Sequence, residues 1–127
     1  MNARHVAVWI DHKEARVFHV GAGSFDVATL HAPHAHLHRH PKGAEGAHDH
    51  PDDAKRFFHD VARALDGADE ILVVGPSTAK LELVRYLQKH DHLLEAKIVG
   101  VETVDHPSDG QLVDYVKRYF RAADRMR

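Results

Sequence analysis

The chain has 127 residues, of which 43% are hydrophobic, 17 are basic and 19 are acidic, so the formal net charge at neutral pH is −2. This length and this apolar content predict a single domain over residues 1–127 with a real hydrophobic core. The balanced charge excludes a strong overall basic field. The absence of cysteine excludes disulfides and thiolate zinc sites.

The sequence shows no signal for export or membrane insertion. The segment from Met1 to His5 lacks the apolar core of a signal peptide. No apolar run approaches the roughly 20 residues that a membrane-spanning helix needs. We therefore expect a cytoplasmic protein with no membrane partner.

Three segments at the start of the chain have the alternating pattern typical of β-strands. They are His5–Ile10, Ala15–Val20 and Phe25–Leu30, and short polar or glycine-containing stretches separate them. Such short connections favour antiparallel hairpins. The first thirty residues therefore predict a three-stranded meander.

From residue 51 onward the apolar period becomes helical. Phe57, Val61 and Leu65 recur every four positions after Pro51, which predicts a helix that ends near Gly67. Two short apolar strands follow, and each leads into another helix. These units are strand Ile71–Val74 with helix Thr78–His90, and strand Ile98–Val104 with helix Asp109–Ala123, which a capping box of Ser108 and Gln111 begins.

The predicted element order is β-β-β-(loop)-α-β-α-β-α. A helix joins the last two strands, which predicts a parallel, right-handed crossover. The sequence therefore predicts an α/β fold with a mixed five-stranded sheet covered by helices, in the order of an RNase H-like domain.

The segment between the third strand and the first helix, residues 31–50, holds seven of the chain's 14 histidines. Four of them alternate, so an extended run places their imidazoles on one face. Neutral imidazole is a metal ligand, whereas imidazolium pairs with phosphate. Three interpretations remain open for this segment: RNA contact, metal binding, or a solvated loop whose histidines have no individual role.

Each functional interpretation has its own residues. For contact with RNA or the ribosome, Arg39 and Lys42 bind phosphates and the histidines add charge as the pH falls, without any cofactor. The full predicted set is His36, His38, Arg39, His40, Lys42 and Gly43. For the alternative, a metal site for zinc or another divalent transition metal, the ligands are His34, His36, His38 and His40. Because same-face neighbours on a strand lie about 6.5–7 Å apart, this run would have to bend around a metal.

The turn after strand Ile71–Val74 is a weaker candidate, an anion site formed by Gly75, Ser77, Thr78 and Lys80. A tight turn that starts a helix presents free N–H groups and the positive end of the helix dipole. In the alternative interpretation, Ser77 or Thr78 is an ordinary N-cap.

Acidic residues near the strand ends raise the question of a nuclease. Two-metal hydrolysis needs several converging carboxylates. Asp11 and Asp105 follow strands, but strand Ile71–Val74 ends without an acid. We interpret Asp11 as a turn residue and Asp105 as a loop acid, and we expect no enzymatic activity.

The second half of the chain resembles a known family. Ile71–Lys80, followed by Leu83–Leu87, resembles the strand, Gly-Pro-type turn and helix of the central domain of archaeal and eukaryotic class I release factors and Pelota. Val101–Val104 and Gly110–Leu112 resemble the family's next strand and last helix. Small single-domain bacterial proteins of this kind are described as translational-machinery proteins.

The resemblance carries an expectation for function. In release factors the loop before the first helix bears a Gly-Gly-Gln tip that enters the peptidyl-transferase centre. The equivalent stretch here, His40–His48, has glycines but no glutamine, which is more like Pelota. The resemblance implies a non-catalytic, translation-associated protein of the stalling, stress or hibernation type, with the ribosome or tRNA as its partner. A metal-binding protein is the alternative.

The meander also exposes an edge strand. Such an edge is able to pair with a second copy of the chain, and nothing in the sequence selects that outcome.

Overall fold

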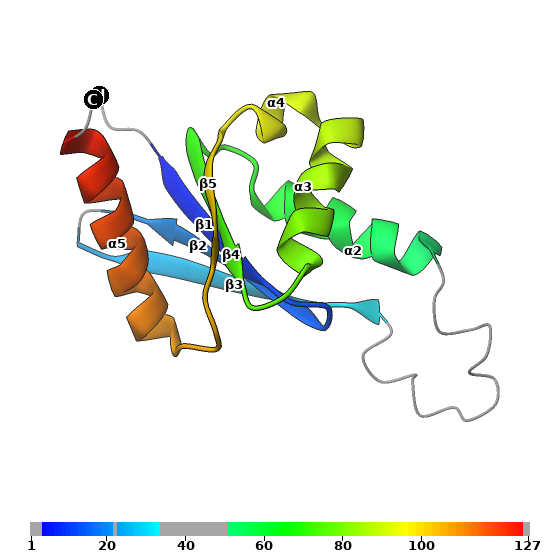
Figure 1. Ribbon diagram of the computed structural model, residues 1–127, viewed down its shortest axis with the longest axis horizontal. Coiled ribbons are helices and arrows are strands. Elements are labelled where there is room, and N and C mark those ends of the chain that lie inside the picture. The colour runs from blue at the N-terminus through cyan, green and yellow to red at the C-terminus, as the bar shows by residue number, and fades with distance from the viewer. Residues whose placement is uncertain (1–3, 22, 34–50, 126–127) are drawn as a thin grey trace.

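A five-stranded sheet lies between two layers of helices (Figure 1). This arrangement comes from a computed structural model, which describes residues 4–21, 23–33 and 51–125. The strands are β1 (His5–Ile10), β2 (Glu14–Val20), β3 (Phe25–His31), β4 (Glu70–Gly75) and β5 (Ile98–Thr103). The helices are α2 (Pro51–Ala64), α3 (Ala79–His90), α4 (His92–Glu95) and α5 (Asp109–Arg125).

The strand order across the sheet is β3-β2-β1-β4-β5. β1 pairs with β2 and β2 with β3 in antiparallel fashion, whereas β1 pairs with β4 and β4 with β5 in parallel. This topology confirms the predicted α/β class, the mixed sheet and the RNase H-like order. The predicted meander and the parallel crossover are both present.

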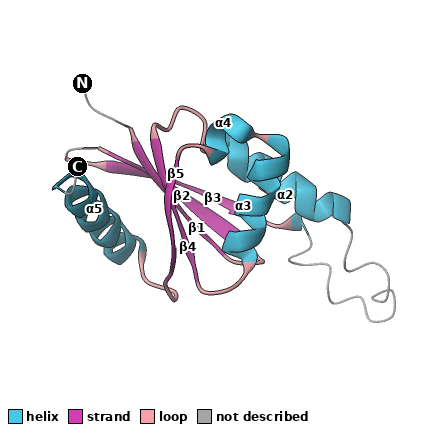
Figure 2. Ribbon diagram, turned by 45° about the horizontal axis from the view of Figure 1, so that its top comes forward, coloured by secondary structure: helices cyan, strands magenta, loops and turns pink. Residues whose placement is uncertain are grey.

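Both faces of the central strands are buried. Val6, Val8 and Ile10 of β1 point into a core shared with α2 and α3, and Ala7 and Trp9 point into a second core beneath α5. Figure 2 shows the two helical layers on opposite sides of the sheet. Because a strand buried on both faces has apolar residues at nearly every position, β1 and β4 form the centre of the fold.

The helices differ from the expected ones at four places; two are small, because α2 ends at Ala64 instead of near Gly67 and α3 begins at Ala79 instead of Thr78. α4 is an additional turn of helix, which Asp91 caps by accepting a hydrogen bond from the N–H of Leu94 at 3.3 Å. α5 extends two residues beyond the predicted end. The expected capping box at its start is confirmed: the N–H of Ser108 donates to Gln111, and the N–H of Gln111 donates to the Ser108 hydroxyl. In the described part of the chain, no helix is long and apolar enough to cross a membrane.

Gly75, at the end of β4, is required by close approach to β1. A Cβ at this position would collide with the carbonyl oxygen of Ile10, which belongs to the neighbouring backbone and cannot rotate away. A glycine at this point therefore allows β1 and β4 to stay paired up to their carboxyl ends.

We expect Gly75→Ala to lower the free energy of unfolding by about 1–3 kcal/mol, because the added methyl group meets backbone atoms. Urea unfolding measures the change. Gly110→Ala is the matched control, since a Cβ there has nothing within 4 Å and lies in α5; we expect it to raise stability by up to about 1 kcal/mol. Equal midpoints for the two variants would contradict the close approach.

Candidate functional site

The histidine-rich segment lies largely outside the described residues, which resume at residue 51 after residue 33. This gap contains all of the residues predicted to contact RNA and all four predicted metal ligands. Their roles therefore stay predictions. The structure does place the two ends between which the segment runs, namely the end of β3 and the start of α2.

Four strands have their carboxyl ends on the same side of the sheet. We call this side the carboxyl-end edge; it is distinct from the outer strands β3 and β5. β1, β4 and β5 are mutually parallel, and β3 is parallel to β1 because both are antiparallel to β2. In open α/β sheets, ligands bind outside the carboxyl ends of the strands. The histidine-rich segment begins at this edge, because it follows the carboxyl end of β3.

The turn between β1 and β2 forms the middle of this edge. The Asp11 carboxylate accepts hydrogen bonds from the N–H groups of Lys13 and Glu14, each at 2.8 Å, which confirms that Asp11 is a turn residue. The N–H of Ala32 donates to the carbonyl of Lys13 at 2.8 Å. The chain that leaves β3 is thereby fastened to this turn.

Three histidines, each close to a carboxylate, line the carboxyl-end edge, and we call them the imidazole rim. His12 Nε2 lies 3.1 Å from Glu82 Oε2, and His31 Nδ1 lies 3.9 Å from Glu14 Oε1. His106 lies between two carboxylates, with Nε2 3.6 Å from Asp11 Oδ2 and Nδ1 2.9 Å from Asp105 Oδ1. The three histidine side chains are 53%, 63% and 61% exposed. Except for His106 with Asp105, none of these pairs is predictable from the sequence pattern, because their members lie on different elements or connections.

At the predicted anion site at the start of α3, the polar side chains bind other groups of the same turn and helix. Lys80 is 8% exposed, and its ammonium donates to the carbonyl oxygen of Ser77 at 2.6 Å. Thr78 is the N-cap residue, but its hydroxyl donates to Glu82 at 3.2 Å and makes no capping bond. Ser77 and Lys80 thus bind each other and Thr78 binds the Glu82 carboxylate, whereas Gly75 lies against the backbone of Ile10. Anion binding at this turn stays a prediction.

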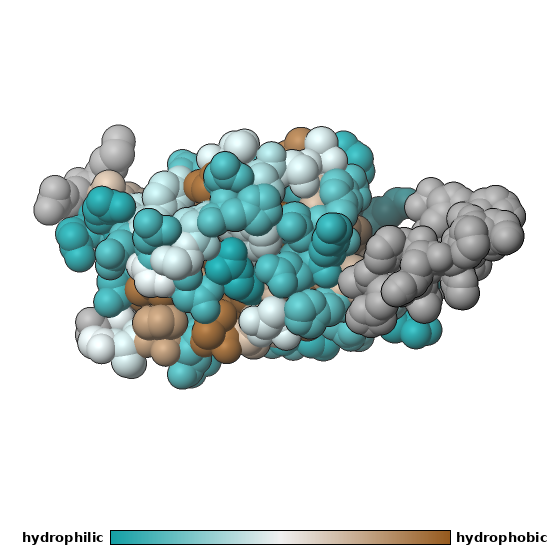
Figure 3. All heavy atoms as spheres, turned by 90° about the horizontal axis from the view of Figure 1, so that it is seen from below, coloured by the Kyte–Doolittle hydropathy of each residue, from teal (hydrophilic) through white to brown (hydrophobic). Residues whose placement is uncertain are grey.

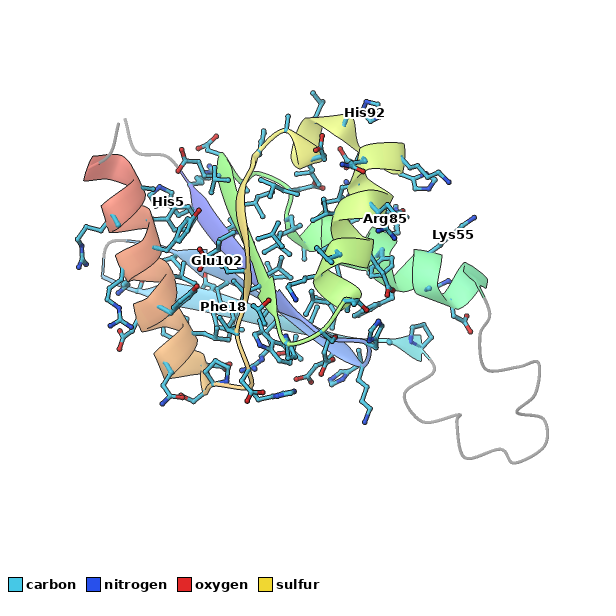
Figure 4. All side chains as sticks on the ribbon, in the orientation of Figure 1. His5, Phe18, Lys55, Arg85, His92 and Glu102 are labelled. Carbon is cyan, nitrogen blue, oxygen red and sulfur yellow. The ribbon has the colours of Figure 1, made fainter. Side chains whose placement is uncertain are left out.

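Four exposed cations lie on the two helices of the layer opposite α5, and we call this group the basic helix face. Its members are exposed and make no ion pair within the described residues: Lys55 and Arg56 on α2, and Arg85 and Lys89 on α3. Figure 4 shows Lys55 and Arg85 on these two helices. Arg85 and Lys89 are four residues apart and therefore share one side of α3. These four cations are available to an external anion.

Arg63, on the same helical layer, is committed to internal ion pairs. The hydrogen bonds that its guanidinium donates to Asp66, and then to Asp91, raise the pKa of Arg63. The guanidinium lies 3.0 Å from Asp66 and 2.9 Å from Asp91. Arg63 therefore joins α2 to the junction between α3 and α4 and does not belong to the basic helix face.

Trp9 and Arg16 bind the segment that connects β5 to α5, residues 104–108, and the first residue of α5. The indole N–H of Trp9 donates to the carbonyl of Asp105 at 2.7 Å. The Arg16 guanidinium lies 4.6 Å from the centre of the Trp9 ring and donates to Asp109 at 2.6 Å. An open depression of about 530 Å³ lies between this segment and α5, with Gln111, Tyr115 and Arg118 on its wall.

The two acids weighed for a nuclease, Asp11 and Asp105, lie on either side of one imidazole, 3.6 Å from Nε2 and 2.9 Å from Nδ1 of His106. Asp11 also accepts the hydrogen bonds of its own turn, and the Asp105 side chain is 93% exposed. Within the described ranges, no group of three or more histidine and acidic side chains is placed to hold a metal ion. A metal site of the predicted kind would therefore rest on the segment between residues 33 and 51.

The phenol of Tyr119 crosses the amino-terminal half of β5 on the α5 side. It donates to the carbonyl of Val99 at 3.1 Å and occupies the space where Gly100 lacks a side chain. Burial raises the pKa of Tyr119 above its ordinary value of 10.0, and the nearby carboxylates of Glu102 and Glu70 raise it further.

Comparisons with known proteins match the structure but not the sequence. No family model matches the chain, and no curated protein sequence matches it. Archaeoglobus fulgidus Pelota superposes with a TM-score of 0.65 at 16% identity, over 93% of this chain and 32% of that protein. This chain has the fold of one domain of Pelota.

Other solved structures agree with this Pelota-like fold. Thermoplasma acidophilum Pelota has a TM-score of 0.63 at 18% identity, over 91% of this chain and 32% of that protein. The archaeal translation termination factor aRF1 has a TM-score of 0.57 at 15% identity, over 96% of this chain and 38% of that protein. The resemblance inferred from the sequence is confirmed at the level of fold, and the chain spans about a third of each of these proteins.

We expect the stability of the Pelota-like fold to depend on the ionisation of Tyr119 at alkaline pH. Since folding raises the pKa of Tyr119 above its ordinary 10.0, its contribution is fully present below pH 10 and is lost as the pH rises through the folded-state value. Urea unfolding of the wild type and Tyr119→Phe between neutral and alkaline pH measures the difference. The gap between the two proteins should change above pH 10, to the disadvantage of the wild type. A gap that stays constant with pH would contradict the raised pKa.

Proposed function

We propose that this chain is a non-catalytic, translation-associated protein that binds the ribosome or tRNA. The observation that carries the proposal is the fold shared over nearly the whole chain with Pelota and aRF1. A further match, Saccharomyces cerevisiae Dom34 with a TM-score of 0.61 at 10% identity, is described as a translation termination-like factor involved in RNA quality control. The proposed docking element is the histidine-rich segment.

The surroundings of this segment support contact with phosphate. It starts at the imidazole rim and ends at α2, the helix that carries Lys55 and Arg56. Phosphate contacts supply most of the affinity for nucleic acid and come mainly from arginine and lysine. In the proposed mode, Arg39 and Lys42 bind the RNA backbone, while His36, His38, His40 and Gly43 complete the contact.

The charge of this surface responds to pH. The net charge of the whole chain is −2, so the attraction is local and does not come from a general positive field. In this proposal the histidines of the segment add positive charge on mild acidification. In this proposal binding therefore strengthens as the pH falls toward 6.

A metal-binding protein is the second candidate, favoured by the alternation of His34, His36, His38 and His40. Imidazole nitrogens are ligands for zinc, nickel and copper. Metal content of untagged protein, purified without a nickel resin, separates the two candidates. Stoichiometric metal that survives dialysis would favour this second function.

The test of the main proposal is co-sedimentation of the untagged protein with ribosomes through a gradient, with and without a chelator. We expect co-sedimentation under both conditions, and we expect Arg39→Ala combined with Lys42→Ala to abolish it. The matched control is Lys117→Ala combined with Arg121→Ala, which removes the same two kinds of charge from α5. The control should sediment like the wild type.

Two outcomes would reject the proposal. Absence of co-sedimentation for the wild type under both conditions would exclude direct ribosome binding. An equal loss for both double variants would mean that general charge, rather than the histidine-rich segment, causes the association.

We also expect a steep salt dependence for binding to tRNA. Each phosphate contact contributes about 0.7–0.9 to the slope of log affinity against log salt, so loss of Arg39 and Lys42 should reduce the slope by about 1.4–1.8. Fluorescence anisotropy with labelled tRNA at several salt concentrations measures it. An affinity that does not change with salt would count against phosphate contact.

A further inference from the structure

Among the described residues, no strand pairs with the outer edge of β3, which leaves this edge open to a partner strand. β3 pairs with β2 through all seven of its residues without a bulge, and β3 is the last strand on this side of the sheet. It contains no lysine and no proline, the residues that commonly protect such edges. Six of its seven residues are exposed, and Leu30 is half-buried.

The hydrogen-bonding direction of β3 follows from its two ends. The carbonyl of Ser24 accepts from Gly21, and the N–H of Ala32 donates to Lys13, so these even-numbered residues face β2. Because direction alternates along an antiparallel strand, the odd-numbered residues present their N–H and C=O groups outward. They are Phe25, Val27, Thr29 and His31.

The same odd-numbered residues share one face of the sheet. Val27 lies opposite Phe18, whose side chain is in the core beneath α5. The ring centre of Phe25 is 6.3 Å from that of Phe18. Phe25 and Val27 nevertheless remain 40% and 38% exposed, and Figure 3 shows apolar surface interrupting the hydrophilic exterior at the lower left of its view.

The edge of β3 is complementary to itself. An antiparallel pairing centred on Ala28 places Phe25 opposite His31 of the second copy, and Val27 opposite Thr29. Each of these pairs joins two residues whose backbone groups face outward. Phe25, Val27, Thr29 and His31 therefore exchange both of their backbone hydrogen bonds with the second copy. Asp26, the one acid of β3, falls opposite Leu30, so no two carboxylates oppose each other.

We propose that two copies of this chain associate through β3 to form a continuous sheet with a two-fold axis at Ala28. The occupant of the edge is a second copy rather than an unrelated peptide, because this one register satisfies all four outward residues and separates the acids. The proposal rests on the described residues of β3 and does not depend on ribosome binding.

The first test is the mass in solution, measured by analytical ultracentrifugation over a dilution series. We expect a species of twice the 14.3 kDa chain mass. Val27→Lys should weaken the dimer about tenfold or more, because the two-fold axis introduces the lysine twice. Val101→Lys is the matched control, since Val101 is also 38% exposed but lies on β5 at the opposite edge; it should leave the dimer unchanged.

The second test reads the register directly in a chain that has no cysteine. Ala28 and its copy form a pair without backbone hydrogen bonds, with Cα atoms about 4.5 Å apart, which is within disulfide range. Ala28→Cys should therefore form a covalent dimer on mild oxidation. Asp26→Cys is on the same face but about 13 Å from its copy along the strands, and it should not form one.

The outcomes are decisive in both directions. A dimer that Val27→Lys weakens and Ala28→Cys traps supports the pairing. A monomer at every concentration would overturn it. A dimer indifferent to Val27→Lys, or trapped equally by both cysteine variants, would also overturn it. Circular dichroism of both lysine variants confirms that any change in mass is not unfolding.

Discussion

Parallel pairing of β1 with β4 is the constraint on which the rest of this structure depends. Both strands are buried on both faces, with Val8 opposite Val73 at the centre of the register. Two such strands are stable only when helices remove both faces from water. The sheet therefore needs α5 on one side and α2 with α3 on the other, and it also needs a crossover long enough to return the chain.

This constraint determines where polar chemistry is able to gather. Because β1, β3, β4 and β5 point the same way, their carboxyl ends and the turns that follow them meet at one edge of the sheet. His12, Glu82 and His106 come from three different connections, yet the first two lie in hydrogen-bond contact. The histidine-rich segment starts from the same edge, so the place where it begins follows from topology rather than from its own composition.

The parts of this structure that local sequence determines were predictable. Ser108 and Gln111 form two hydrogen bonds across one helical turn, and Asp11 binds the backbone of its own turn. The alternation in β1 was visible as well, although an apolar Trp9 on the second face shows that the strand is buried on both sides. Such features depend on neighbours a few residues away.

Contacts between distant parts of the chain could not be predicted from local sequence patterns. The pair His12–Glu82 spans 70 residues, and the bonds that hold the segment after β5 span 93 and 96 residues. α4 escaped prediction because a single turn with one buried side chain, Leu94, has no periodicity to detect. The imidazole rim was missed for the same reason: its partners meet only after the sheet has formed.

Trp9 gives this arrangement an optical consequence. It is the only tryptophan of the chain, it is fully buried, and its indole binds the carbonyl of Asp105. The ring of His106, a member of the rim, stands edge-on to it with centres 5.1 Å apart, and Arg16 lies over its face. Indole emission is sensitive to its hydrogen bond and to neighbouring cations, so the intrinsic fluorescence of this protein is a label-free reporter of one corner of the rim.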